Sequence, residues 1–248
     1  ANLGLKKNKI ALKFANRAIE LNNNNLNAIY TRGRIKIELY DYQSGIEDFN
    51  LVKQKDPLSI YFNPDKMIGI AYLFLKNHQS AIIHFDKAIR INPLDANSIA
   101  NRGYSKMETA DYIGANKDFT KALELAPNEA GGFANLGDLK LKLRYFEEAI
   151  NDFTNAINID NDYSYAYVGR GDAKQKLGKF DDAIKDYTKA IKINNKELFG
   201  YIKRGYLLIK KNKINQGCSD YKKALALNEN LSRKYIQNEE LINCKISI

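Results

Sequence analysis

Histidine, cysteine and carboxylate side chains are the first candidates for chemistry, and their spacing here does not suit catalysis or metal binding. The two histidines, His78 and His84, lie six residues apart with no cysteine nearby. Metal ligands on one helical face lie three or four residues apart, so this pair does not predict a metal site. No nucleophile has a histidine and a carboxylate placed to activate it, and no glycine-rich phosphate loop is present. We therefore expect no enzyme, no cofactor and no small-molecule substrate.

The composition is that of a folded and strongly basic chain. Hydrophobic residues make up 44% of the 248 residues, which is too apolar for a disordered protein. The formal net charge of +10 suits a nucleic acid, an anionic membrane or an acidic protein as a partner. No run approaches the roughly 18 apolar residues that span a bilayer, so no membrane span is expected. No Ser/Gly/Pro-rich stretch marks a linker, which favours one continuous domain.

Regularly spaced glycines divide the chain into similar units. They are separated by 36 residues once and then by 34 residues four times: Gly33, Gly69, Gly103, Gly137, Gly171 and Gly205. An aromatic residue follows each glycine by sixteen positions: Phe49, Phe85, Phe119, Phe153, Tyr187 and Tyr221. Apolar residues recur at helical spacing on both sides of Gly178 and Lys179, which predicts two helices joined by a turn in each unit.

The unit resembles the tetratricopeptide repeat, a 34-residue helix pair with small residues at its eighth, twentieth and twenty-seventh places and an aromatic at its twenty-fourth. The twentieth place here holds Gly45, Ala81, Ala115, Ala149, Ala183 and Gly217. The family's aromatic at the fourth place is kept only as Phe133, Tyr167 and Tyr201, and Asp65 stands there in the second unit. The resemblance implies an all-α, right-handed superhelical solenoid of antiparallel helix pairs.

The repeat register predicts how this single domain is divided. The expected parts are a partial repeat at 1–25, full repeats at 26–61, 62–95, 96–129, 130–163, 164–197 and 198–231, and a capping helix at 232–248. The partial repeat is expected to hold the tail of a first helix followed by a second helix. This start in mid-repeat suggests that the chain is truncated or that further repeats precede it. Repeat arrays need polar caps at their ends, which is the role predicted for residues 232–248.

Charged pairs recur inside the units. Arginine precedes the glycine in four units, as Arg32, Arg102, Arg170 and Arg204, and the same units carry an aspartate just before the aromatic, as Asp48, Asp118, Asp186 and Asp220. A buried guanidinium needs a carboxylate partner, so we interpret these residues as ion pairs between the two helices of each unit. A ladder of arginines that binds an anionic ligand is the alternative.

The two cysteines allow a disulfide bond. Cys218 stands where other units have isoleucine, and Cys244 lies near the end of the expected capping helix. That end is expected to pass beside the start of the last second helix, where Cys218 lies. A disulfide would fix the cap in an exported or periplasmic protein, whereas two free thiols would indicate the cytoplasm.

The resemblance also implies where a partner binds, because first helices line the concave groove in this family. Related members hold the backbone of an extended peptide with asparagines at the sixth place, which corresponds here to Asn101 and Asn135. An amide side chain both donates and accepts, which suits contacts to a peptide backbone. The other predicted groove residues are Lys66, Ile70, Phe74, Tyr104, Tyr165, Phe199, Lys203 and Tyr206.

These observations predict a scaffold or adaptor that binds a protein or peptide in its concave groove. The alternative is nucleic-acid or anionic-surface binding through a basic convex face made by Lys185, Lys189, Lys192, Lys222 and Lys223. This alternative lacks interleaved aromatic residues on which bases could stack. Self-association through the ends of the stack is a third, structural role.

Overall fold

A computed structural model describes residues 2–57, 62–237, 241 and 243–246, and within these ranges the chain forms helices and short connections without a strand. The chain forms two compact units, Ala1–Ala126 and Pro127–Ile248. We refer to them as unit 1 and unit 2. None of the described helices is both long and apolar enough to cross a bilayer.

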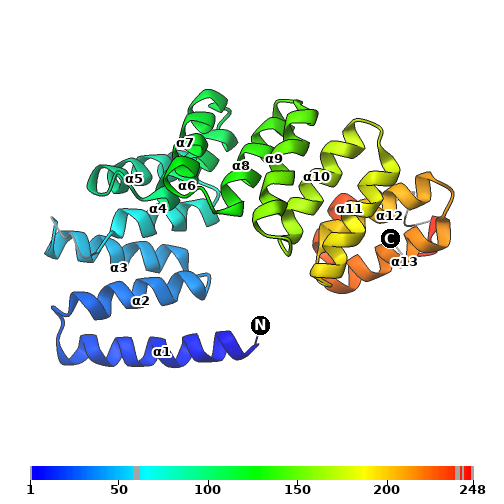
Figure 1. Ribbon diagram of the computed structural model, residues 1–248. Helices are drawn as coiled ribbons and strands as arrows, with labels where there is room; N and C mark the ends of the chain where they lie inside the picture. Colours follow the sequence, from blue (N-terminus) through cyan, green and yellow to red (C-terminus); the bar gives the residue numbers. More distant parts are fainter. Residues whose placement is uncertain (1, 58–61, 238–240, 242, 247–248) are drawn as a thin grey trace. The chain divides into compact units, whose positions relative to one another are not determined.

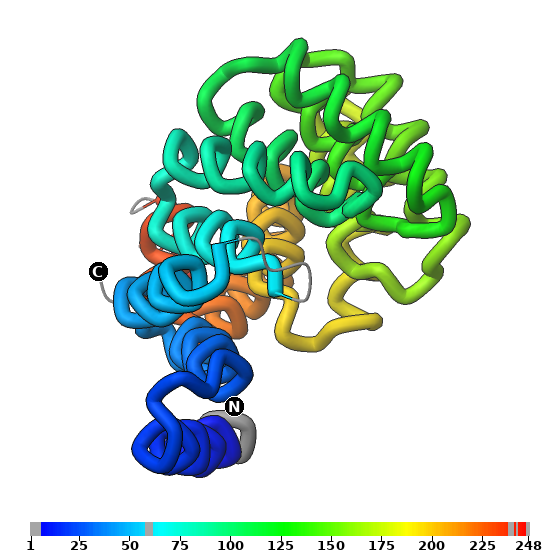
Figure 2. Tube along the Cα trace, turned by 90° about the vertical axis from the view of Figure 1, so that its left-hand side faces the viewer, coloured from blue at the N-terminus to red at the C-terminus, as the bar shows by residue number. Residues whose placement is uncertain are grey.

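Unit 1 begins with the long helix α1 and continues with three helix pairs (Figure 1). Their bounds are α1 Asn2–Leu21, α2 Leu26–Glu38, α3 Tyr42–Lys55, α4 Pro64–Phe74, α5 His78–Ile91, α6 Ala96–Glu108 and α7 Tyr112–Leu125. Figure 2 shows α1 to α5 stacked in chain order, from blue to cyan. The helix α1 is uninterrupted, where the sequence predicts the tail of one helix and a second helix. It contains no glycine or proline after Gly4, and these are the residues that most strongly interrupt a helix.

Unit 2 contains three further helix pairs and a short final helix. Their bounds are α8 Ala130–Lys142, α9 Phe146–Ile159, α10 Ser164–Lys176, α11 Phe180–Ile193, α12 Leu198–Lys210, α13 Ile214–Leu227 and α14 Glu229–Tyr235. The sequence predicts one capping helix over 232–248, whereas α14 ends at Tyr235 because Ile236 is extended (φ −94°, ψ 125°). Within that range, residues 238–240, 242 and 247–248 lie outside the described residues.

The repeated glycines lie where the two helices of a pair come closest. A Cβ atom added to Gly103 would lie 2.9 Å from the ring of Phe119, and one added to Gly171 would lie 2.6 Å from the ring of Tyr187. Both rings are almost completely buried. The small residue and the aromatic sixteen positions later are therefore the two sides of one contact, as ridge-and-groove packing requires.

Local backbone features end the helices at matching positions. Side chains of Asn25, Asp41 and Asn77 accept hydrogen bonds from the first turns of α2, α3 and α5, which caps these helices. The turn inside every pair contains one residue in the left-handed region: Tyr40, Lys76, Ala110, Arg144, Gly178 and Asn212. Glycine and asparagine adopt this conformation readily, so Gly178 and Asn212 suit it and the other four turns hold residues that it disfavours.

Candidate functional site

The predicted arginine–aspartate pairs are confirmed in all four repeats. The distance from Arg Nη2 to Asp Oδ1 is 2.6 Å for Arg32–Asp48, 2.6 Å for Arg102–Asp118, 2.8 Å for Arg170–Asp186 and 2.7 Å for Arg204–Asp220. In each pair Nε also donates to Oδ2, so the contact is bidentate. The aspartates are buried, and the arginines are therefore committed to the fold rather than to a ligand.

A lysine one turn after the arginine position joins the same carboxylates, which the sequence analysis missed. The lysine–aspartate distances are 2.9 Å for Lys36–Asp48, 2.9 Å for Lys106–Asp118, 2.7 Å for Lys174–Asp186 and 2.5 Å for Lys140–Asp152. The last pair lies in the repeat where Leu136 replaces the arginine. The sequence spacing could have predicted this contact, because a lysine four residues after the arginine position lies on the same helical face.

The second repeat reverses the direction of this pairing. Asp65, at the fourth place of its repeat and in the first turn of α4, is buried, and its Oδ1 lies 2.7 Å from Nδ1 of His84 and 2.8 Å from Nζ of Lys53. Burial alone would raise the pKa of Asp65, but hydrogen bonds from His84 and Lys53 outweigh it and hold this pKa below its ordinary value. In this repeat His84 stands where the others have the aspartate before the aromatic residue. Asp65 thus supplies the carboxylate of the pair from the first helix instead.

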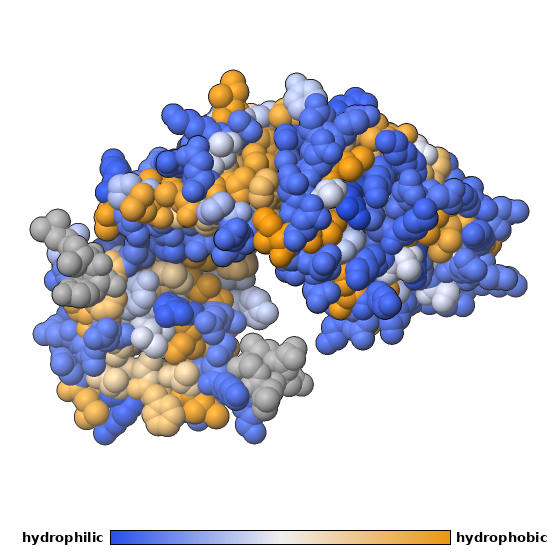
Figure 3. Space-filling view, viewed as in Figure 1, coloured by the Kyte–Doolittle hydropathy of each residue, from blue (hydrophilic) through white to orange (hydrophobic). Residues whose placement is uncertain are grey.

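Four predicted groove residues of unit 2 line one cavity of about 630 Å³: Tyr165, Phe199, Lys203 and Tyr206. We call it the unit-2 cavity. It lies on the side of the first helices α8, α10 and α12 and is completed by α9, α13, α14 and Gln237. Its other apolar and aromatic lining residues are Leu141, Phe146, Val168, Ile202, Tyr221 and Tyr235. Hydrophilic residues cover most of the face of unit 2 that is visible in Figure 3.

An ion pair lies between the aromatic residues of this cavity. Nζ of Lys203 on α12 lies 2.7 Å from Oδ2 of Asp172 on α10. The hydroxyl of Tyr187 donates to Oδ1 of Asp172 at 2.8 Å. Burial and the charge of Asp172 raise the pKa of Tyr187 far above its ordinary value, so the phenol stays protonated. Asp172 was not predicted as a site residue, although it stands at the same place in its repeat as the predicted Tyr206.

Aromatic residues of five helices, α9, α10, α12, α13 and α14, line this cavity. The ring of Phe199 lies 5.1 Å from the ring of Tyr235 in an edge-to-face arrangement. On the α10 side, the Tyr165 hydroxyl donates to Oδ2 of Asp138 at 2.6 Å. Both contacts set the direction of a ring that lines the cavity, and such rings supply large contact areas in binding sites.

The remaining predicted groove residues are not among the residues that line the unit-2 cavity. Asn135 on α8 is half-buried and is not among the residues that line the unit-2 cavity. Asn101 and Ile70 are half-buried in unit 1.

Three other predicted groove residues of unit 1 already have local contacts. Nζ of Lys66 lies 2.8 Å from Oδ2 of Asp95. The ring of Phe74 stacks on that of Tyr42 at 5.2 Å, and the ring of Tyr104 lies 6.0 Å from that of His78.

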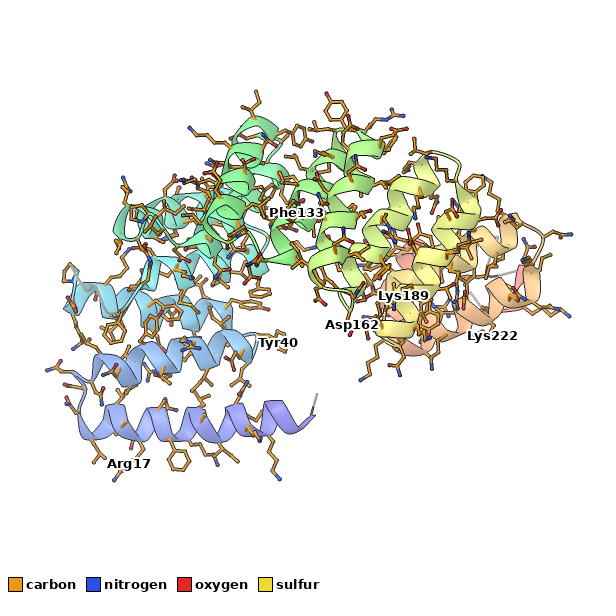
Figure 4. The ribbon with its side chains drawn as sticks, viewed as in Figure 1. Arg17, Tyr40, Phe133, Asp162, Lys189 and Lys222 are labelled. Carbon is orange, nitrogen blue, oxygen red and sulfur yellow. A yellow bond between two sulfur atoms is a disulfide. The ribbon has the colours of Figure 1, made fainter. Side chains whose placement is uncertain are left out.

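The predicted convex lysines have local partners in part. Nζ of Lys185 lies 2.9 Å from Oδ1 of Asp182, and Nζ of Lys189 lies 5.9 Å from the centre of the Tyr167 ring. Figure 4 labels Lys189 on α11 and Lys222 on α13. These lysines therefore lie on second helices, as predicted, away from the lining of the unit-2 cavity.

The two cysteines lie at disulfide distance. Their Cα atoms are 5.2 Å apart, with Cys218 on α13 and Cys244 in the turn that follows Leu241 and Asn243. This separation falls in the range that a disulfide spans. Both side chains pack in one buried cluster with Tyr201, Ile202, Tyr221, Ala224, Ile236 and Leu241.

Similar solved structures share the fold along most of the chain. The crystal structure of the APC/C hetero-tetramer Cut9–Hcn1 has a TM-score of 0.78 at 15% identity, covering 96% of this chain and 46% of that chain. The chain thus spans less than half the length of that relative. A tetratricopeptide repeat protein from Parabacteroides merdae has a TM-score of 0.75 at 20% identity, covering 94% of this chain and 90% of that one. The crystal structure of MamA has a TM-score of 0.54 at 23% identity, covering 67% of this chain and 97% of that one.

Sequence comparison with known families gives the same result as the repeat pattern. A search of curated proteins finds no match. Tetratricopeptide repeat profiles match residues 164–196 and residues 67–93, 130–163 and 200–231, together just over half of the chain. With the glycine–aromatic contacts and the helix pairs in register, these matches show that the chain belongs to the tetratricopeptide repeat family.

Proposed function

We propose that this chain is an interaction scaffold and that its unit-2 cavity holds a peptide segment of a partner protein. Tetratricopeptide repeats form scaffolds for protein–protein interaction. The observation that carries the proposal is that Tyr165, Phe199, Lys203 and Tyr206, chosen from sequence, line a single cavity. At about 630 Å³ the cavity is in the size range of ligand-binding pockets, enough for one or two bulky side chains.

The chemistry of the cavity suits a peptide better than a purely apolar ligand. An apolar ligand would bury the Lys203–Asp172 pair without replacing its contacts with water, which is unfavourable. A peptide backbone instead offers a carbonyl to the ammonium and an N–H to the carboxylate. We therefore propose that the ligand places a bulky apolar side chain between Phe199 and Tyr165 and lays its backbone over the ion pair.

The asparagines remain part of the proposal as backbone-binding groups. Asn101 and Asn135 stand at the same place of their first helices, each half-buried with a side chain that can donate and accept. Each would extend the contact with a peptide within its own unit. An oxidised Cys218–Cys244 pair would further place this activity in an exported or periplasmic setting.

The proposal is tested by selecting peptides from a random display library on the immobilised full chain and titrating the enriched peptides by fluorescence anisotropy. Phe199→Ala should weaken binding by about 2 kcal/mol, because aromatic anchors in central pockets carry most of the binding energy. Ile159→Ala removes a partly exposed side chain at the end of α9, outside the cavity lining, and should leave affinity unchanged. Equal affinity of wild type and Phe199→Ala would contradict the proposed site.

A second variant pair separates the peptide site from the basic convex face. Lys203→Met should weaken peptide binding, whereas Lys192→Met, on the exposed side of α11, should not. Nucleic-acid binding through the convex lysines would show the opposite order. With five lysines it would also lose roughly 500-fold in affinity between about 50 and 200 mM salt, whereas a peptide in the cavity should lose far less.

A further inference from the structure

The C-terminal segment forms part of the unit-2 cavity. Tyr235, the last residue of α14, and Gln237, two residues later, both line it. The Tyr235 side chain is 57% exposed, and its described ring contact is the edge-to-face one with Phe199. One wall of the proposed binding site therefore depends on where the end of α14 is held.

The helix α14 is too short to hold that position by itself. It has seven residues, and helices of this length are marginal in water without tertiary contacts. Its first turn is capped by the Asn228 side chain, which accepts from the Leu231 N–H at 3.0 Å. Its last turn, which carries Tyr235, is followed directly by the extended Ile236. Ser232 is the buried residue of α14, so the position of Tyr235, three residues later, depends strongly on what anchors the chain after it.

That anchor is the buried cluster around the two cysteines. Ile236, Leu241 and Cys244 pack there against Tyr201 and Ile202 of α12, while Cys218 belongs to α13. Ile202 is both a member of this cluster and a lining residue of the unit-2 cavity, so the cluster and the cavity share a wall. The Cys218–Cys244 contact is the point at which this segment can be covalently tied to the last helix pair.

We propose that the Cys218–Cys244 bridge is a positioning element of the unit-2 cavity. It ties the segment after α14 to α13 and thereby keeps Tyr235 against Phe199. The consequence for ligand affinity rests on the proposed function, whereas the positioning of Tyr235 does not. Cys218 and Cys244 themselves do not line the cavity.

The redox chemistry of this element is a simple exchange. A dithiol reductant supplies two electrons and two protons, the Sγ–Sγ bond breaks to give two thiols, and the dithiol closes to its own disulfide. The cysteine side chains are only 9% and 6% exposed, so reduction requires local opening of the C-terminal segment. Once reduced, the segment keeps only non-covalent contacts, and the wall formed by Tyr235 and Gln237 loosens.

The first test uses tryptophan fluorescence without a ligand. The chain contains no tryptophan, so Tyr235→Trp places a single reporter in the cavity wall. Dithiothreitol is added until thiol titration shows two free thiols. The emission of the reporter should then shift to the red and its quenching by acrylamide should increase. Phe133→Trp, on α8 and packed against the core of unit 2, is the matched reporter for the rest of the unit and should not change.

Two outcomes would overturn the proposal. An unchanged signal from Tyr235→Trp on reduction would show that the bridge does not position the wall. Equal changes in both reporters would show that the bridge maintains the fold of the whole unit. The variant Cys218→Ser with Cys244→Ser should reproduce the reduced state, which separates the effect of the bridge from other effects of the reductant.

A binding cycle then tests the consequence for the ligand. With the selected peptide, reduction and Tyr235→Ala should each lower affinity, and reduction should lower affinity less in Tyr235→Ala than in the wild type, because Tyr235 is one of the two wall residues that the bridge positions. An equal loss on reduction in wild type and in Tyr235→Ala would overturn the coupling. If no peptide binds in either redox state while the two reporters behave as expected, the proposed function fails and the positioning role stands.

Discussion

Nδ1 of His84 on α5 lies 2.7 Å from Oδ1 of Asp65 on α4, with the partners exchanged relative to the arginine–aspartate pairs of other repeats. In those repeats the first helix supplies the cation and the second the carboxylate, whereas here the first helix supplies the carboxylate. The second repeat therefore keeps a buried carboxylate that is hydrogen-bonded between its helices, without the family's aromatic residue at the fourth place.

This exchanged pair gives the first prediction, on pH dependence. A carboxyl whose folded pKa is lowered stabilises the fold above its unfolded pKa, about 3.9, and this stability is lost as pH falls through the folded value. At neutral pH, Asp65→Asn should lower the free energy of unfolding by about 1–3 kcal/mol, because Lys53 and His84 lose their carboxylate. The difference from wild type should shrink in acid. Urea midpoints across the acid range measure it, and Glu47→Gln, at an exposed position of α3, is the matched control.

Packing at the repeated glycines gives the second prediction. Gly103→Leu should unfold its neighbourhood, because even a Cβ atom would meet the Phe119 ring at 2.9 Å. Overpacking of this kind lowers stability by about 1–3 kcal/mol for small additions and more for leucine. Gly131→Leu is the control, since nothing lies within 4 Å of a Cβ atom there. Similar thermal midpoints for the two variants would show that the glycine contact is not tight.

Left-handed turns give the third prediction. A Cβ atom would meet nothing within 4 Å at Gly178 or at Gly131, but Gly178 has φ +75°. Gly178→Ala should therefore lower the free energy of unfolding by about 1 kcal/mol, whereas Gly131→Ala should be neutral or stabilising. Denaturant titration of the two variants isolates the backbone contribution, because neither substitution creates a clash. A stabilising Gly178→Ala would contradict the strain assigned to this turn.

The shared carboxylates give the fourth prediction. Asp186 accepts from both Arg170 and Lys174, so Arg170→Leu leaves one cation in place, as Leu136 does naturally beside Lys140 and Asp152. Arg170→Leu and Lys174→Leu should each be tolerated, while the double variant should lose about 3–5 kcal/mol because it leaves a buried charge unpaired. A double-mutant cycle in unfolding experiments measures how far the loss in the double variant exceeds the sum of the two single losses. Simple additivity would indicate that Asp186 remains solvated.

The asparagines give the fifth prediction. Asn101→Ala combined with Asn135→Ala should leave the melting temperature unchanged, since both side chains are only half-buried, and should weaken binding of a selected peptide. Thermal unfolding and anisotropy titration on the same sample separate the two effects. Unchanged affinity would show that the asparagines do not contact the peptide. It would not affect the proposed role of Phe199, which Phe199→Ala tests separately.

The repeat register could be predicted from sequence because its signals are steric and periodic. The contact of Gly103 with Phe119 leaves no room for another side chain, so the chemistry of both positions is visible in the sequence. The same holds for Arg170 and Asp186, whose charges need each other wherever they are buried. Such pairs depend only on the geometry of one helix pair, which repeats throughout the chain.

Features at the chain ends and between repeats were harder to predict. α1 is one helix because no glycine or proline follows Gly4 within it, and α14 ends early because Ile236 is extended. Asp172 and Tyr235 join the unit-2 cavity through contacts with other repeats or with the C-terminal segment. No periodic pattern encodes contacts of this kind, so the sequence indicated residues of the first helices that line the cavity but not the boundary of the cavity.

All four paired arginines also reach back to the preceding helix, including Arg32, whose Nη1 donates to Oδ1 of Asn16 on α1 at 3.4 Å. Nη1 of Arg170 donates to Thr154, Nη1 of Arg204 to Thr188, and Nη1 of Arg102 to Asp86. One guanidinium thus joins three helices and couples neighbouring modules within a unit. A helix pair moved to another place in the array, or grafted into another protein, would retain its internal arginine–aspartate pair. It would lose the hydrogen bond from Nη1 to the preceding helix unless the new neighbour had an oxygen acceptor at the equivalent position. Exchange of modules during evolution or engineering is consequently restricted to neighbours that carry a matching acceptor.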